Sequence, residues 1–244
     1  MKKAAFDRIS LLVGEEAMSR ISQTKVIIFG IGGVGSWVAE CLIRTGIENI
    51  TLVDSDKVSV SNINRQMPAT VATIGEVKTL AAKRRLLEIN PEAAISVYTL
   101  FYSEDTSHLI NLSDYDVIVD AIDSLKDKAL LILNATRSGR KFYSSMGAAL
   151  KLDPTKVKVA EFWNVKGCPL ARALRQKFKR EREFPARKFL CVYSDEVLDN
   201  RGVTFETCEY KACINGSLCH ITAIFGMTIA GEIIKDIVES VESP

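Results

Sequence analysis

The stretch KVIIFGIGGVGSW, residues 25–37, decides the fold that this sequence predicts. Its first part is an apolar run typical of a buried strand, and its second part is rich in glycine. Gly30, Gly32 and Gly35 match the pattern G-x-G-x-x-G, in which glycines let the backbone turn tightly and come close to a phosphate group. The helix that follows would offer free N–H donors and the positive end of its dipole. The stretch, with Gly33 in the same turn, therefore predicts a strand, a phosphate-binding turn and a helix.

A carboxylate lies where the ribose of a nucleotide would need one. Asp54 follows Gly35 by nineteen residues and comes directly after an expected second strand at residues 50–53. A carboxylate at that place can accept hydrogen bonds from ribose hydroxyls. The two features indicate a nucleotide in a Rossmann-type site without saying which nucleotide. A tight strand-to-helix turn that binds no ligand is the alternative.

The loop after this strand is dense in polar groups that suit a polyphosphate. It reads DSDKVSVSNINRQ over residues 54–66. The polar residues in question are Asp56, Asn62, Asn64, Arg65 and Gln66. Arg65 can offer a planar fork of donors to phosphate oxygens, and Lys78, near the start of the next expected helix, can act as a point charge on a phosphate. Taken alone, each has another interpretation: a loop ion pair for Arg65 and a solvated helix face for Lys78.

Asp123, in the sequence VDAIDS, follows an expected strand at residues 117–119. The carboxyl edge of an open α/β sheet is where such folds bind ligands. A Mg²⁺ ion that bridges phosphates typically takes one or two carboxylates from the protein. Asp123 is therefore a candidate Mg²⁺ ligand, with a helix N-cap as the alternative, and the order of these residues favours a triphosphate site.

Strand-like and helix-like segments alternate through the first 150 residues. The expected strands are 26–29, 50–53, 94–98, 117–119 and 141–144, and the expected helices are 9–22, 33–44, 75–89 and 127–136. This alternation predicts an α/β fold of the Rossmann-like type, with a mostly parallel sheet and helices on both faces.

From residue 151 the pattern changes to a β-rich and helical second half. Its expected segments are a β-rich run at 157–162, a basic helix at 169–183, a loop-like segment to Glu209 and a closing helix at 217–238. We expect a single domain over residues 1–244, with a nucleotide-binding half at 1–150 and a substrate and dimerisation half at 151–244.

Composition is that of an ordinary soluble globular protein. Of the 244 residues, 47% are hydrophobic and 25% are charged, and the formal net charge is +2, so nucleic-acid binding would need a local basic patch. The longest uncharged run, residues 214–231, carries polar groups and suits a core or interface helix better than a membrane span. The N-terminus lacks the apolar run of a signal peptide, and we expect a cytoplasmic protein without a transmembrane segment.

Six cysteines without any Cys-x-x-Cys pair argue against a four-thiolate zinc site. Free thiols are the default in a reducing cytoplasm. Buried, inert cysteines are the favoured interpretation, and a catalytic thiol at Cys168 or Cys219 is the weaker alternative. His108 and His220 have no partner pattern and are given no role.

Four motifs in this order, GIGGVGSW, LVDSDKVSVSNINRQ, GEVK and DAIDS, make the sequence resemble the UBA/ThiF superfamily of adenylating enzymes. The resemblance implies a Rossmann-like fold that binds ATP and Mg²⁺ and adenylates a carboxylate. It places Asp54 on the ribose and Asp123 on Mg²⁺. Arg8, in FDRIS, matches an N-terminal arginine that reaches the partner subunit's triphosphate, which implies an obligate homodimer. The implied phosphate contacts are Asn62, Arg65 and Lys78, and the implied catalytic set is Arg65, Lys78, Asp123 and Arg8.

Residues 144–178 narrow the resemblance to one branch. The phrases SSMGAA, LDPT and CPLAR within them are similar to the TcdA (CsdL) branch, the tRNA threonylcarbamoyladenosine dehydratases. This branch implies a tRNA substrate whose modified adenosine, beside the anticodon, carries a threonine carboxylate that is adenylated by ATP and then cyclised with net loss of water. It also makes a cysteine desulfurase or sulfur acceptor a candidate partner. Ala148 and Ala149 depart from the branch, in which many members have glycine.

A basic stretch at residues 172–188 offers a surface for tRNA phosphates. It holds eight basic residues, and its only acidic residues are Glu181 and Glu183. The expected tRNA contacts are Arg172, Arg175, Lys177, Lys179 and Arg180. Binding through phosphates would depend on salt concentration. A solvated amphipathic helix is the alternative.

Three other functions stay open at this point. A MoeB- or ThiF-type enzyme would adenylate the C-terminal glycine of a small sulfur-carrier protein. An NAD-dependent oxidoreductase would use the same glycine turn, although the sequence shows no acid/base pattern for hydride transfer. A nucleotide-binding partner protein of a sulfur relay, without chemistry of its own, would not need Arg65, Lys78 and Asp123.

Overall fold

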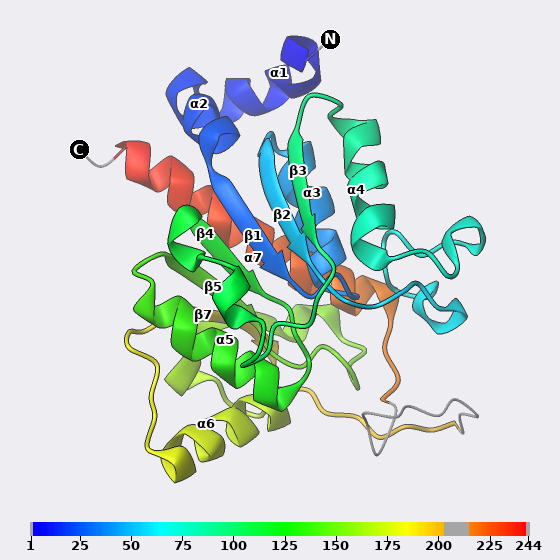
Figure 1. The fold of residues 1–244 in the computed structure, drawn as a ribbon, viewed down its shortest axis with the longest axis vertical. Helices are drawn as coiled ribbons and strands as arrows, with labels where there is room; N and C mark the ends of the chain where they lie inside the picture. The colour runs from blue at the N-terminus through cyan, green and yellow to red at the C-terminus, as the bar shows by residue number, and fades with distance from the viewer. Residues whose placement is uncertain (1, 203–214, 243–244) are drawn as a thin grey trace.

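The computed structural model describes residues 2–202 and 215–242, which form a seven-stranded sheet with helices on both faces (Figure 1). The strands are β1 (Lys25–Phe29), β2 (Asn49–Val53), β3 (Ala94–Tyr98), β4 (Val117–Asp120), β5 (Lys141–Ser145), β6 (Val157–Glu161) and β7 (Leu190–Ser194). Their order in the sheet is β3-β2-β1-β4-β5-β7-β6. Neighbouring strands are parallel except β6 and β7, which are antiparallel. The predicted mostly parallel, Rossmann-like sheet is confirmed.

Helices cover this sheet on both sides, as a parallel sheet requires. They are α1 (Lys2–Val13), α2 (Glu15–Gln23), α3 (Gly35–Arg44), α4 (Lys78–Ile89), α5 (Leu125–Arg137), α6 (Pro169–Glu181) and α7 (Cys219–Glu242). Helices α3, α4 and α7 pack on one face, and α5 and α6 pack on the other. Among the described residues, no helix is both long and apolar enough to cross a membrane.

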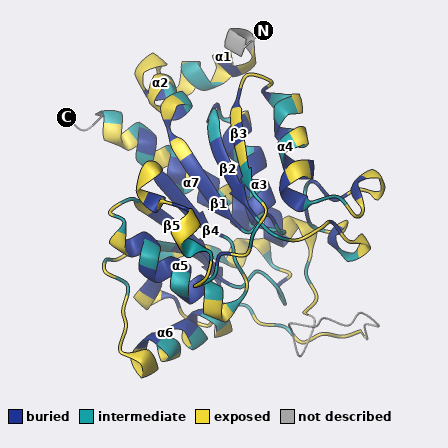
Figure 2. Ribbon diagram, viewed as in Figure 1, coloured by how far each residue is buried: buried dark blue, intermediate teal, exposed yellow. Residues whose placement is uncertain are grey.

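The side chains of β1 show why both faces are filled. Val26 and Ile28 belong to the core under α3 and α7, whereas Ile27 and Phe29 belong to the core under α5 and α6. This division follows from the alternation of side chains along a strand. All four side chains are fully buried, and burying one of them stabilises the fold by about 1.5–3 kcal/mol. Figure 2 shows the resulting buried centre in dark blue.

Strand β7 corrects the expectation that the chain is loop-like from the end of the basic helix to Glu209 (residues 203–209 of that segment lie outside the described part). Its five residues, LCVYS, pair in parallel with β5 and antiparallel with β6. The run is too short for its periodicity to distinguish a strand from an irregular buried segment. Because the Met146 N–H donates to the Val192 carbonyl at 2.8 Å, the chain that leaves β5 continues alongside β7.

Several predicted boundaries shift for reasons of backbone conformation. The helix expected at 9–22 is two helices, α1 and α2, separated at Gly14, whose φ is 82°. Helix α4 begins at Lys78 rather than at Gly75, because Gly75 has a φ of 87° and Val77 forms a bridge with Lys57. The closing helix α7 spans Cys219–Glu242 instead of 217–238.

Candidate functional site

The glycine turn between β1 and α3 is closed by backbone packing. The Gly30 N–H donates to the Val53 carbonyl at 2.8 Å, and a Cβ at Gly30 would lie 2.7 Å from the Ala121 carbonyl oxygen. A Cβ at Gly35 would lie only 1.9 Å from the Gly30 oxygen. Among the described residues, the atom nearest to a Cβ at Gly32 would be Gln66 Nε2, at 4.0 Å. Gly30 and Gly35 therefore hold the turn together, and Gly32 leaves room for a ligand.

A cleft of about 1030 Å³ lies where β1, β2, β4 and β5 end. It is lined by the glycine turn, the loop after β2, the start of α4, the loop after β4, the segment after β5 and the segment before α7. Its volume matches the upper part of the range found for small-molecule sites. The predicted residues that line it are Gly30, Gly32, Gly33, Asp54, Asp56, Asn62, Arg65, Gln66, Lys78 and Asp123. Ten predicted residues from distant parts of the chain thus share one cleft.

Asp54 organises the floor of this cleft. Its carboxylate accepts hydrogen bonds from the Ile31 N–H at 2.6 Å and the Asp56 N–H at 2.8 Å. Burial raises the pKa of Asp54 above its ordinary value, and the positive charge of Lys78 and the two backbone hydrogen bonds oppose that rise. Each carboxylate oxygen has a further lone pair, so Asp54 can also accept from the hydroxyls of a ribose.

Lys78 is the first residue of α4 and is buried, which argues against its interpretation as part of a solvated helix face. The Lys78 ammonium group lies 2.8 Å from the Asp56 carboxylate, and the Lys78 backbone N–H donates to the Asp56 backbone carbonyl at 2.9 Å. Asp56 was predicted to contact the nucleotide, and in this structure it pairs with Lys78. Asp56 thus holds the Lys78 ammonium at the cleft, where a phosphate can also contact it.

The loop that carries Arg65 is also preorganised. The Arg65 guanidinium donates to the Ser61 carbonyl at 2.7 Å and to Asn64 Oδ1 at 2.8 Å, and the Trp37 indole N–H donates to the Arg65 carbonyl. Asn62 is buried and accepts from the Ser59 N–H through Oδ1. Asn64, which donates to the Ser217 carbonyl, is not among the residues that line the cleft.

Two buried oxygen atoms in the cleft have no hydrogen-bond partner among the described residues. They are Gln66 Oε1 and Ser55 Oγ. Unpaired buried polar atoms are costly, so their presence fits a site that a polar ligand completes. Ser55 lies inside the loop that was singled out in the sequence, but its small, common side chain gave no separate signal.

Asp123 is exposed in the loop between β4 and α5, and Asp127 lines the same cleft. No group of three or more His, Cys, Asp or Glu side chains is placed to hold a metal ion within residues 2–202 and 215–242. One or two carboxylates fit a Mg²⁺ ion held mainly by phosphate oxygens, since that ion usually takes few protein ligands.

A buried network under this loop was not found from the sequence. The Lys128 ammonium lies 2.8 Å from the Asp120 carboxylate, with both side chains inaccessible to solvent. Ser144 donates to the same carboxylate at 2.7 Å, and Lys128 also donates to the Ile122 carbonyl at 2.9 Å. The network fixes the backbone that presents Asp123. Lys128 lies on a helix at ordinary spacing, and nothing in its sequence context indicates that it is buried.

Arg8 does not belong to the cleft of its own chain. It is exposed on α1, which lies beyond the amino end of β1, whereas the cleft lies at the carboxyl end (Figure 1). Leu11 and Leu12 on the same helix are 86% and 85% exposed.

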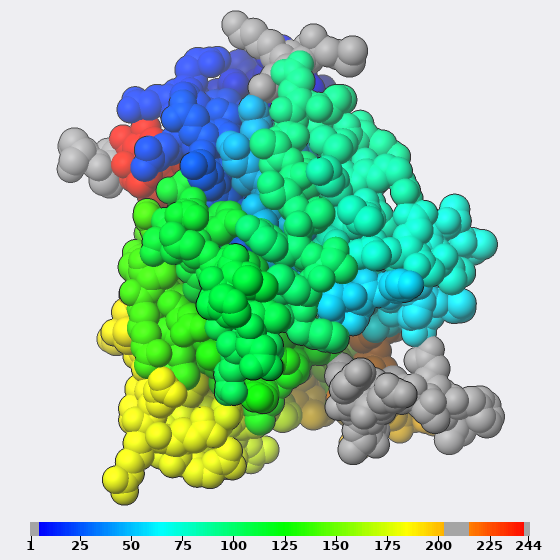
Figure 3. Space-filling model, in the orientation of Figure 1, coloured from blue at the N-terminus to red at the C-terminus, as the bar shows by residue number. Residues whose placement is uncertain are grey.

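The five basic residues expected to contact tRNA divide into three groups on α6, which forms a corner of the molecule (yellow in Figure 3). Arg175 lies over the Phe162 ring at 5.8 Å and donates to the Phe162 carbonyl. Lys177 and Arg180 both pair with Glu181. Arg172 and Lys179 are exposed.

Among the described cysteines, the buried interpretation holds for Cys168 and Cys191 and not for Cys219. Cys168 and Cys191 are buried, Cys41 is half-buried and Cys219 is exposed, and burial raises the pKa of the Cys191 thiol. Cys208 and Cys213 lie outside the described residues. His220 contacts the Leu152 carbonyl at 3.0 Å, and His108 is exposed.

Comparisons with known proteins give relatives over most of the chain. A model of the ThiF family matches residues 6–243. The tRNA threonylcarbamoyladenosine dehydratase of Haemophilus influenzae is 36% identical, over 96% of this chain and 93% of that protein. Crystal structures of Escherichia coli TcdA with AMP and with ATP match at TM-scores of 0.89 and 0.86 and 31% and 30% identity, each covering 99% of this chain and 97% of the other. A sulfur carrier protein adenylyltransferase of Thermus thermophilus is 34% identical over only 49% of this chain and 44% of that protein.

Proposed function

The chain belongs to the ThiF family, and from that premise we propose that it is an ATP-dependent tRNA threonylcarbamoyladenosine dehydratase. One observation carries the proposal: the polar residues expected to bind ATP come from separate segments of the chain and line a single cleft. Relatives that bear this name match the chain along nearly its whole length, whereas the sulfur-carrier enzyme matches about half of it.

In the proposed complex, the ribose of ATP lies on Asp54 and the phosphates lie against the glycine turn. Arg65 and Lys78 neutralise the phosphate charge, and Asn62 and Gln66 supply further polar contacts. Asp123 would hold Mg²⁺, which neutralises charge on phosphate oxygens when bound. Fixed charges of this kind favour a transition state in which negative charge moves to the leaving pyrophosphate.

The proposed reaction has two steps. A carboxylate oxygen of the substrate's threonyl group attacks the α-phosphorus of ATP, so that an acyl-adenylate forms and pyrophosphate leaves. The neighbouring urea group then attacks the activated carbonyl, loses a proton, and expels AMP together with the former carboxylate oxygen. The net change in the nucleoside is the loss of one water. Both steps depend on positioning and charge neutralisation, and neither requires a cysteine or histidine nucleophile.

We further propose a homodimer in which Arg8 reaches the partner's ATP site. Its support is the position of Arg8 away from its own cleft, together with the exposed leucines of α1. The exposed side of α6 is the proposed tRNA surface. A tRNA substrate fits a cytoplasmic enzyme, and a cysteine desulfurase stays a candidate partner without an assigned surface.

The proposal is tested with purified tRNA that bears the linear modification. Wild-type enzyme and ATP should release AMP and pyrophosphate, and mass spectrometry of the nucleoside should show the loss of one water. Lys78→Ala should abolish this turnover with its circular dichroism spectrum unchanged, whereas Lys57→Ala, a neighbouring exposed lysine, should stay active. ATP consumption that depends on a sulfur-carrier protein, with no water loss from tRNA, would instead establish the adenylyltransferase alternative.

A further inference from the structure

Lys151 is a buried cation in the wall of the main cleft. Its side chain is 5% exposed and belongs to the segment that follows β5. The ammonium donates to the backbone carbonyl of Glu196, and no carboxylate of the described residues lies within ion-pair distance of it. Burial lowers the pKa of Lys151, and the nearby Cys168, Glu196 and Asp195 oppose that change. A buried ammonium without a carboxylate partner is costly, and an anion in the cleft would offset this cost.

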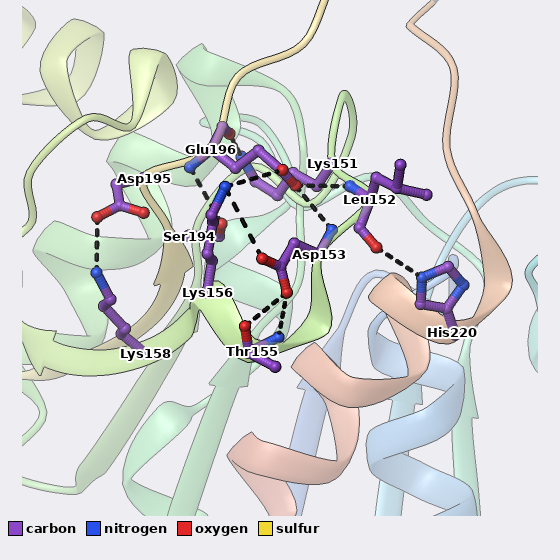
Figure 4. Close-up of polar contacts among 10 residues, drawn as sticks. All are labelled: Lys151, Leu152, Asp153, Thr155, Lys156, Lys158, Ser194, Asp195, Glu196 and His220. Atoms are coloured by element: carbon purple, nitrogen blue, oxygen red, sulfur yellow. Dashed lines mark hydrogen bonds and ion pairs between the residues drawn. The ribbon is translucent and has the colours of Figure 1, made fainter.

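Glu196 accepts from Lys151 through its backbone carbonyl, but its side-chain carboxylate is engaged with other groups. Glu196 accepts hydrogen bonds from the N–H groups of Leu152 and Asp153 at 2.6 Å and 2.9 Å, and pairs with Lys156 at 3.3 Å (Figure 4). These contacts bind the carboxylate to the backbone just beyond Lys151. Glu196 therefore fixes the segment that carries Lys151 but does not neutralise its charge.

The backbone on both sides of Lys151 is held by two other segments. The Leu150 N–H donates to the Gly216 carbonyl at 2.9 Å, and the Leu150 carbonyl accepts from the Leu198 N–H at 2.9 Å. On the other side, the Leu152 carbonyl contacts the His220 ring at 3.0 Å. Leu150 has a φ of 59°, a conformation that costs a residue with a side chain about 1 kcal/mol or more and persists only where its surroundings impose it. The fold thus keeps the Lys151 side chain in the cleft wall.

The position of Lys151 distinguishes it from the predicted ATP contacts. Asp54, Arg65 and Lys78 follow β2, and the glycine turn follows β1, whereas Lys151 follows β5, on the other side of β4 in the sheet. A nucleotide held on the β1 and β2 side leaves the β5 side of the cleft for the second substrate. The group on that substrate that must approach the α-phosphate is an anion, the threonyl carboxylate.

We propose that Lys151 is the positioning residue that binds this carboxylate before it is adenylated. The inference rests on the proposed function. It has a consequence for product release, because cyclisation removes the negative charge and with it the attraction to Lys151. The site would then favour the linear, charged nucleoside over the cyclised, neutral product.

The test compares two anticodon stem-loops that differ only in this group. One bears the linear threonylcarbamoyl modification with its carboxylate, and the other bears the neutral carboxamide. Wild-type enzyme should bind the carboxylate form more tightly by about tenfold or more, the usual effect of a charge-assisted hydrogen bond. Lys151→Gln keeps a donor for the Glu196 carbonyl but removes the charge, and it should lose this preference. Lys151→Arg should keep part of it.

The controls separate this role from a structural one. Lys158→Met removes a nearby exposed lysine that pairs with Asp195, and it should keep the full preference. ATP affinity should stay unchanged in Lys151→Gln, while KM for modified tRNA should rise. Equal binding of the two stem-loops by wild-type enzyme, or an undiminished preference in Lys151→Gln, would overturn the proposal. Because binding is measured without turnover, a failure of the proposed function would appear separately, as absence of water loss with wild-type enzyme.

Discussion

At the scale of single residues, burial at the cleft disfavours the charged forms of side chains that the site needs to be charged. Asp54 is partly buried, yet it is kept in place by two backbone N–H groups and by the field of Lys78. Lys78 in turn is buried beside Asp56, whose side chain is 53% exposed. The chain thus keeps several charges at one cleft by pairing and hydrogen bonding them, which is the condition for retaining buried charges.

The raised pKa of Asp54 predicts an acid limb in ATP binding. An ionised carboxylate accepts from ribose hydroxyls, so ATP affinity should fall as pH falls through this pKa, at a higher pH than an ordinary aspartate would cause. Calorimetric titration with ATP from neutral to mildly acidic pH measures this limb. Asp54→Asn should bind ATP more weakly at neutral pH and show no such limb. An identical limb in the variant would mean that another group is responsible.

Sequence reasoning at this scale correctly predicted which residues share the cleft where a motif fixed both the residue type and its place. Gly30, Asp54 and Asp123 follow strands, and strand ends meet at one edge of a parallel sheet. It could not find Lys128 or Lys151, because each reads as an ordinary surface lysine until the tertiary fold buries it. Nor could it show that Arg175 packs on Phe162, a contact between separate elements.

At the scale of elements, the glycine turn separates stability from binding. Gly35 lies against the Gly30 carbonyl oxygen, whereas the described atom nearest to a Cβ at Gly32 is 4.0 Å away. The two glycines of one motif therefore have different reasons to lack a side chain.

Gly35→Ala and Gly32→Ala should differ in what they impair. The added methyl at Gly35 would force the turn apart, and we expect a loss of about 1–3 kcal/mol or more in the free energy of unfolding, measured by denaturant titration. Gly32→Ala should leave this free energy nearly unchanged and weaken ATP binding about tenfold, or ~1.4 kcal/mol. Similar losses of stability in both variants would contradict the distinction.

Helix α6 also contains residues with separate tasks. Changing Arg172 and Lys179 together to Gln should weaken tRNA binding across sequences and reduce its salt dependence by about one ion per lost phosphate contact. Arg175→Gln should instead lower stability by about 1–2 kcal/mol, because it loses the contact with the Phe162 ring and carbonyl. Filter binding at several salt concentrations and thermal unfolding measure the two effects. An unchanged salt slope in the double variant would remove α6 from the tRNA surface.

Helices were predictable where their apolar periodicity extended over many residues. Strands were predictable where strand-like and helix-like segments alternate along the chain. The five strands expected in the first half are all present, with shifts of at most one residue at their ends. Strand β7 was not predicted, because its five residues form a strand only through pairing with β5 and β6 in the sheet. The break at Gly14 depends on a positive φ that an amphipathic pattern does not reveal.

At the scale of the whole molecule, the proposed dimer predicts complementation between two inactive variants. Arg8→Ala and Lys78→Ala should each be inactive alone. A mixed dimer has one site with an intact Lys78 and the partner's intact Arg8, and one site that lacks both. Random mixing after subunit exchange should restore about a quarter of the wild-type turnover, because half of the dimers then carry one working site. No recovery in mixtures shown to exchange subunits would mean that Arg8 acts within its own chain or not at all.

The order of the strands has a further consequence for biosynthesis. Strand β6 is made before β7, yet among the described residues its only sheet neighbour is β7, so β6 cannot join the sheet until residues 190–194 have been synthesised. Helix α7 follows later still, and its Phe225, Ile229 and Ile233 complete the core beside α3. A nascent chain on the ribosome therefore leaves the apolar surface beside α3 uncovered until α7 emerges. Synthesis that stops before α7 would leave an aggregation-prone intermediate, because this apolar surface would stay exposed. Chaperones would be needed mainly at this stage of synthesis.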